Sequence, residues 1–265
     1  MIKKVIVFDL DETLGYFTQI GVLFDTIELF TSKEIEFSLF CKLFDLYNEV
    51  FRVNIFGILN YLKRMKKSGK VKVMVYTNNQ ADKTWCLNIV KYIEQKISYK
   101  LFDHVIHAYK IGNNRIEQCR TSHDKKYSDL IKCGNLPSDT KVCFIDDQFH
   151  RHMKHKNVHY INVKPYTFKI KNTEFFDKFF KNDVFTEIIK IYEIEKEGHF
   201  KTFIKNHFKN MNFITQRGEG ELSANKILTK KIMYHIQKFV SKRIVTKKNK
   251  ISTRNPNKRT RKNKE

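Results

Sequence analysis

The sequence predicts an α/β protein in which a parallel sheet is flanked by helices. Short apolar runs recur along the chain, and polar residues follow each of them directly: 3–8, 71–76 and 141–145. Segments with helical spacing lie between and after these runs: 54–67, 83–97 and 127–133. Strands that alternate with helices are typical of a parallel sheet whose strands are buried on both faces.

The individual elements have recognisable starts and stops. The segment 54–67 places apolar residues on one face and has a basic last turn before Gly69, which is a typical helix end. Residues 158–163 predict a further strand, and 175–196 predict a helix or helix pair that completes the core. Trp85, in the second helical segment, is expected in the core, with a place in a substrate pocket as the alternative.

Residues 16–50 interrupt the alternation of strands and helices. They are rich in Phe, Leu and acidic residues, and we interpret them as a small helical insertion after the first strand, covering the carboxyl edge of the sheet. A plain helical crossover is the alternative interpretation.

Charge is distributed unevenly along the 265 residues. The chain has 51 Lys and Arg against 28 Asp and Glu, a net charge of +23, of which +16 lies in residues 196–265. We therefore predict an α/β domain at 1–197, a basic helical extension at 198–244 and a disordered basic tail at 245–265. In the extension, apolar residues share one helical face: Leu228, Ile232, Ile236, Val240 and Ile244. Such a basic amphipathic helix docks on its own domain, lies on an anionic membrane or contacts nucleic acid.

The expected compartment follows from apolar runs and cysteines. No run approaches the roughly 20 residues that span a bilayer, so no membrane span is expected. Five cysteines without a CxxC pair indicate reduced thiols and an intracellular, cytoplasmic or nuclear protein. Basic runs at 247–264 are typical of a nuclear address. The sequence does not indicate an oligomeric state.

Polar residues follow three of the predicted strands and are expected to meet at one edge of the sheet. They are Asp9, Asp11, Thr13, Thr77, Asn78, Asn79, Asp146 and Asp147. Two carboxylates about 4 Å apart repel by about 4 kcal/mol at an effective dielectric constant of about 20, so a bound cation or shifted pKa values are expected. Oxygen ligands without Cys or His favour Mg²⁺. The histidines at 150, 152, 155 and 159 lack metal-ligand spacing and are expected in a solvated basic loop.

This arrangement predicts phosphoryl transfer. Asp9 is the candidate nucleophile, and Asp11 is the candidate general acid that protonates the leaving oxygen and later activates water. Thr77 and a lysine are expected to hold the remaining phosphoryl oxygens.

The motifs resemble those of the haloacid dehalogenase (HAD) superfamily of phosphatases, and this resemblance implies a Rossmann-like fold. It covers the motifs DLDET at 9–13, YTNN at 76–79, a lysine near 125 and FIDD at 144–147. The form DLDETL resembles the branch of carboxy-terminal-domain phosphatases, which act on phosphoserine and phosphothreonine in proteins. The resemblance implies Thr77 as a phosphate ligand and Mg²⁺ held by Asp9, the Asp11 carbonyl, Asp146 and Asp147. Asn78, next to Thr77, is a further candidate phosphate ligand. Lys125 is preferred over Lys126 as the phosphate-binding lysine because of its spacing from the next helix.

The function expected from the sequence is therefore a Mg²⁺-dependent phosphomonoester hydrolase acting on a phosphorylated protein or small molecule. The alternative is a nucleic-acid-associated protein, either a polynucleotide phosphatase or a non-catalytic binding module. In that case residues 226–264 would contact nucleic acid without sequence specificity.

Overall fold

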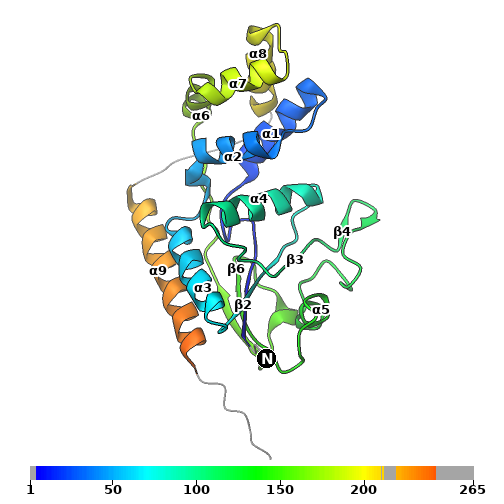
Figure 1. The fold of residues 1–265 in the computed structure, drawn as a ribbon, viewed down its shortest axis with the longest axis vertical. Helices are drawn as coiled ribbons and strands as arrows, with labels where there is room; N and C mark the ends of the chain where they lie inside the picture. Colours follow the sequence, from blue (N-terminus) through cyan, green and yellow to red (C-terminus); the bar gives the residue numbers. More distant parts are fainter. Residues whose placement is uncertain (1–3, 210, 212–218, 243–265) are drawn as a thin grey trace, which may run out of the picture.

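A five-stranded parallel sheet forms the centre of the protein in the computed structural model, which describes residues 4–209, 211 and 219–242. The strand order is β3-β2-β1-β6-β7. The strands are β1 (Lys4–Phe8), β2 (Lys72–Tyr76), β3 (His104–Ile106), β6 (Lys141–Asp146) and β7 (Val158–Asn162). Helices flank this sheet (Figure 1), so the predicted α/β class with a parallel sheet is confirmed, and the arrangement is consistent with the predicted Rossmann-like architecture.

The central strand β1 explains why the apolar runs were recognisable. All five of its residues are buried, because β2 and β6 pair with its two edges and helices cover both faces. The three-residue strand β3 was not predicted, since its first residue, His104, is exposed and the run is too short to show a pattern. A small antiparallel hairpin, β4 (Lys110–Ile111) and β5 (Asn114–Arg115), lies outside the main sheet.

Three helices lie close to their predicted positions: α3 (Ile55–Lys67), α4 (Lys83–Lys96) and α5 (Tyr127–Cys133). Gly69 follows α3 with a φ of 68°, a left-handed conformation that glycine adopts without strain. The Asp82 carboxylate accepts a hydrogen bond from the backbone N–H of Thr84 and thereby caps the start of α4, as an acidic N-cap does.

The predicted insertion at 16–50 is helical, with α1 (Thr18–Thr31), α2 (Phe37–Leu46) and the 3₁₀ turn η1 (Asn48–Val50). This insertion packs against helices from later in the chain. Three later helices gather around α1 and α2 (Figure 1): α6 (Asn172–Phe180), α7 (Asp183–Ile191) and α8 (Glu197–Lys209). Because α8 packs on α1, the predicted division at residues 197 and 198 falls in the first turn of a packed helix. That division remains a prediction.

The helix α9 (Glu219–Ser241) begins before the predicted start at 226 and docks on the sheet beside β7. Ile232, Ile236 and Val240 of the predicted apolar face are buried. The Lys4 ammonium, also buried, donates to the main-chain oxygens of Phe239, Val240 and Lys242 and thus satisfies carbonyl groups at the end of α9. Ile244, the tail at 245–265 and the basic runs at 247–264 lie outside the described residues. None of the described helices combines the length and apolar character that a bilayer crossing requires.

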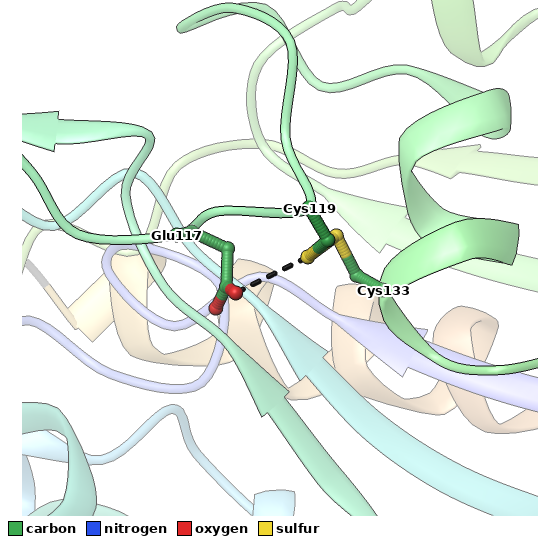
Figure 2. Close-up of side chains that lie close together, drawn as sticks. All are labelled: Glu117, Cys119 and Cys133. Carbon is green, nitrogen blue, oxygen red and sulfur yellow. Dashed lines mark hydrogen bonds between the residues drawn. A yellow bond between two sulfur atoms is a disulfide. The ribbon is translucent and has the colours of Figure 1, made fainter.

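The expectation that all five cysteines are reduced thiols is wrong for two of them. Cys119 and Cys133 form a disulfide across 14 residues of sequence, with Glu117 close by (Figure 2). The loop before α5 folds back against the end of that helix and brings the two Cα atoms within 5.2 Å. Spacing alone gave no signal for this pair. Cys41, Cys86 and Cys143 are free thiols.

Candidate active site

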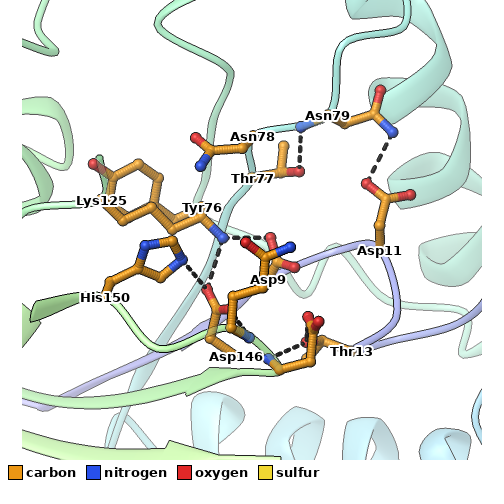
Figure 3. A network of polar contacts seen from close by, with 12 residues as sticks. Asp9, Asp11, Thr13, Tyr76, Thr77, Asn78, Asn79, Lys125, Asp146 and His150 are labelled. Carbon is orange, nitrogen blue, oxygen red and sulfur yellow. Dashed lines mark hydrogen bonds and ion pairs between the residues drawn. The ribbon is translucent and has the colours of Figure 1, made fainter. Parts of the chain in front are cut away.

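Polar side chains from the ends of three adjacent strands meet at the carboxyl edge of the sheet (Figure 3). Asp9 follows β1, Thr77 follows β2, and Asp146 is the last residue of β6. Since β1 lies between β2 and β6 in parallel register, the three positions fall side by side. The predicted meeting of these residues at one edge is therefore observed.

Lys125 lies at the centre of this group. Its ammonium is 2.5 Å from Asp9 Oδ1 and 2.7 Å from Asp146 Oδ2, and its side chain is only 2% exposed. The neighbouring Lys126 instead donates to the Thr121 hydroxyl. Of the two candidate lysines, Lys125 is thus the one that the fold places at the carboxylates.

The pKa values of the two buried carboxyl groups, Asp9 and Asp146, are shifted in opposite directions. Burial raises the pKa of Asp9 well above its ordinary value, Asp146 and Asp11 add to this rise, and the attraction of Lys125 opposes it. Burial also acts to raise the pKa of Asp146, but hydrogen bonds from His150 and Lys125 and the positive charge of Lys125 hold that pKa below its ordinary value. Burial acts to lower the pKa of Lys125, yet Asp9 and Asp146 together raise it. A further positive charge beside Asp9 would therefore favour its ionised, nucleophilic form.

Three carboxylates form a group that suits a hard cation. Oxygen atoms of Asp9, Asp146 and Asp147 all lie within 4.8 Å of one another. The Asp147 carboxylate accepts a hydrogen bond from the Thr13 hydroxyl, which also accepts one from the Asp147 backbone N–H. Lys125 supplies one positive charge against three negative ones, and an all-oxygen donor set is the kind that Mg²⁺ prefers. The residues present therefore fit a magnesium ion.

Asp11 is close to this group but faces another direction (Figure 3). Its carboxylate accepts a hydrogen bond of 2.8 Å from the Asn79 side chain, and its side chain is not among the three grouped carboxylates. Burial raises the pKa of Asp11, while the hydrogen bond from Asn79 opposes this rise. A carboxyl group with a raised pKa is suited to donating a proton. The sequence placed Asn79 among the polar residues at this edge but did not assign it a role.

The predicted phosphate ligands Thr77 and Asn78 are held by a residue that the sequence did not reveal. Arg120 is fully buried and donates to the main-chain oxygen of Thr77 and to the side-chain oxygen of Asn78, at 3.1 and 2.7 Å. The Thr77 hydroxyl accepts from the backbone N–H of Asn79, which fixes the turn after β2. The amide oxygen of Asn78 is thus engaged with Arg120. A single arginine in a polar loop gives no pattern that would have identified it.

His150 was wrongly expected to be a solvated loop residue. Its Nε2 lies 3.4 Å from Asp146 Oδ2, and its side chain is 11% exposed. The turn after β6 brings it back over the strand end, four residues after its partner. The position of His150, four residues after Asp146, was the signal in the sequence that could have indicated this contact. Treating the histidines as one group did not reveal it.

A second buried arginine supports the loop that carries Asp11. Arg52 donates to the main-chain oxygens of Glu12, Thr13 and Lys164. Glu12 has a φ of 56°, an uncommon conformation for a non-glycine residue. The two arginines therefore hold the loops that follow β1 and β2 in place.

Comparisons with known proteins give little beyond this geometry. No protein-family model and no curated protein matches the chain. Among solved structures, the chain is similar to Fcp1, an essential RNA polymerase II CTD phosphatase, at 16% identity and a TM-score of 0.36. The match covers 89% of this chain but 64% of that chain, so it spans less than two thirds of the length of Fcp1. At this level of similarity, the functional argument depends on the site itself.

Proposed function

We propose that the protein is a Mg²⁺-dependent phosphomonoester hydrolase that works through an aspartyl-phosphate. The observation that carries the proposal is the buried contact of Lys125 with Asp9 and Asp146, next to Asp147, at the carboxyl edge of the sheet. Carboxylates grouped around one buried lysine leave an excess of negative charge, which suits a cation, and a bound cation would in turn attract a phosphoryl group.

In the proposed reaction, an oxygen of Asp9 attacks phosphorus and the bond to the leaving oxygen breaks. Asp11 donates its proton to that oxygen, and the leaving group departs as an alcohol. Asp11, now ionised, then takes a proton from water as the water attacks phosphorus, which releases inorganic phosphate and regenerates Asp9. Lys125, the Thr77 hydroxyl and the Asn78 amide would bind phosphoryl oxygens.

Asp9, Asp146 and Asp147, together with the main-chain oxygen of Asp11, would hold the magnesium ion. When bound, the ion neutralises charge between the attacking carboxylate and the phosphoryl oxygens.

Hydrolysis of an aryl phosphate tests this proposal. Activity should require Mg²⁺, disappear with a chelator and return when Mg²⁺ is restored. Asp9→Asn, which keeps the shape of the side chain, should remove activity. Asp177→Asn, which neutralises an exposed aspartate on α6, should retain it. Turnover that survives either the chelator or Asp9→Asn would refute the proposed mechanism.

A second proposal concerns nucleic acid and is favoured by the exposed side of α9. The lysines at 226, 230, 231, 238 and 242 are all exposed, while the opposite face packs on the domain. Binding of a fluorescent oligonucleotide should weaken steeply with salt. Changing Lys230 and Lys231 to Gln should reduce the salt dependence. Binding that is absent at low salt, or unchanged in this variant, would contradict the proposal.

A further inference from the structure

A cavity of about 310 Å³ lies beside Asp11, between α1, α4 and the turn after β2. Four aromatic residues are among those that line it: Phe17, Phe24, Phe40 and Trp85. The Trp85 ring lies 5.4 Å from that of Phe24 and 5.6 Å from that of Phe40, measured between centroids. Gly21 of α1 also faces this ring, and a Cβ there would lie at an ordinary van der Waals distance of 3.4 Å from it. Trp85 therefore belongs both to the aromatic packing and to the cavity.

Among the residues that the structure describes, every charged side chain that lines this cavity is acidic: Asp11, Asp25, Glu28 and Asp82. This is unusual in a chain with 51 basic and 28 acidic residues. Two of these side chains are fixed by hydrogen bonds, since Glu28 accepts from the backbone N–H of Ile35 and Asp82 accepts from that of Thr84. Asp25 is exposed. Partial burial raises the pKa of its carboxyl group, and the nearby His207 opposes this rise.

The position of Asp11 relates this cavity to the reaction. Asp11 and its partner Asn79 both line the cavity, whereas Asp9 and Lys125 do not. An acid that protonates the leaving oxygen lies on the leaving-group side of phosphorus. The part of the substrate beyond that oxygen would therefore extend past Asp11 into the space between α1 and α4.

We infer that this cavity selects the leaving group, and that it favours a phosphopeptide with Lys or Arg beside the phosphorylated residue. This inference rests on the proposed function. The aliphatic stem of a lysine or arginine suits the aromatic wall, and its charge is complementary to Asp25 and Glu28. A nucleic acid would instead bring further phosphates toward these carboxylates, which disfavours it at this position.

Two phosphoserine peptides test the inference, identical except that arginines flank the phosphoserine in one and glutamates in the other. The ratio of their kcat/KM values, measured by phosphate release, is the readout, so a general change in activity cancels. The parent protein should prefer the basic peptide at least about tenfold, and Asp25→Asn with Glu28→Gln should reduce this preference about tenfold. Gln at 28 keeps an oxygen for the Ile35 N–H.

A matched control neutralises one aspartate and one glutamate outside the cavity, Asp177→Asn with Glu195→Gln, and should keep the preference. Equal peptide ratios in the two double variants would overturn the inference. So would a higher kcat/KM for the acidic peptide or for a 5′-phosphorylated oligonucleotide. Absence of aryl phosphate hydrolysis would instead refute the proposed function, and this inference with it, whereas hydrolysis without charge preference refutes the inference alone.

Discussion

Replacing Lys125 by Met should destabilise the fold strongly, because it leaves two buried carboxylates without their shared partner. The Asp9 and Asp146 side chains are 10% and 0% exposed. At an effective dielectric constant of about 20, an ion pair with a separation of 2.7 Å is worth about 6 kcal/mol before desolvation. Since the desolvation of the ammonium is no longer required in the variant, the net loss of unfolding free energy should be about 3 to 5 kcal/mol.

Urea unfolding at neutral pH, in the presence of a chelator, measures this loss. Asp9→Asn removes one of the two charges, so Lys125→Met should cost at least about 1.5 kcal/mol less in that background. Lys126→Met is the matched control and should cost no more than about 0.5 kcal/mol, because its contact is near the surface. Added Mg²⁺ should stabilise the Lys125→Met protein more than the parent, since the ammonium no longer repels the cation. A cost below about 1 kcal/mol, or an equal cost for Lys126→Met, would refute the reasoning.

Three further predictions concern stability elsewhere. Lys4→Met should cost about 1 to 3 kcal/mol by removing donors from the end of α9, seen as faster hydrogen exchange in α9; unchanged exchange there would contradict it. The Cys119–Cys133 disulfide closes a loop with a sequence separation of 14, so its reduction should lower the unfolding free energy by about 3 kcal/mol. Urea unfolding with and without reductant measures this loss, and equal midpoints would argue against a stabilising bond. Burial lowers the pKa of His107 from 6.5 to about 4. Between these two pH values, the unfolded chain therefore binds a proton at His107 that the folded chain does not. The free energy of unfolding should fall by at most about 3 kcal/mol from pH 6.5 to pH 4, and by less in His107→Gln. Equal pH profiles for the parent and this variant would exclude the contribution of His107.

The sheet and the polar residues at its carboxyl edge were predictable because the signal for both is local. Buried parallel strands such as β1 are short apolar runs, and parallel pairing places Asp9, Thr77 and Asp146 together once the strands are recognised. The buried face of α9 followed from its periodicity, although the sequence could not decide whether that face met the domain, a membrane or nucleic acid.

The supporting residues could not be predicted because their partners are main-chain atoms or distant loops. Arg52 and Arg120 bind carbonyl groups whose positions depend on the folded turns, so no spacing in the sequence indicates them. The Cys119–Cys133 pair and the contact of His150 with Asp146 likewise depend on how two loops fold back. In each case the tertiary structure creates a contact that composition and periodicity do not encode.

The contact of Lys4 with the end of α9 also restricts when the protein can finish folding during synthesis. Lys4 and its acceptors are separated by 235 to 238 residues, and the two neighbours of β1 begin at Lys72 and Lys141. At about 5 to 20 residues per second, ribosomes need roughly 10 to 50 s to make the intervening chain. The central strand therefore leaves the ribosome long before its partners, and its apolar residues must be kept from aggregation until β6 and α9 have been synthesised.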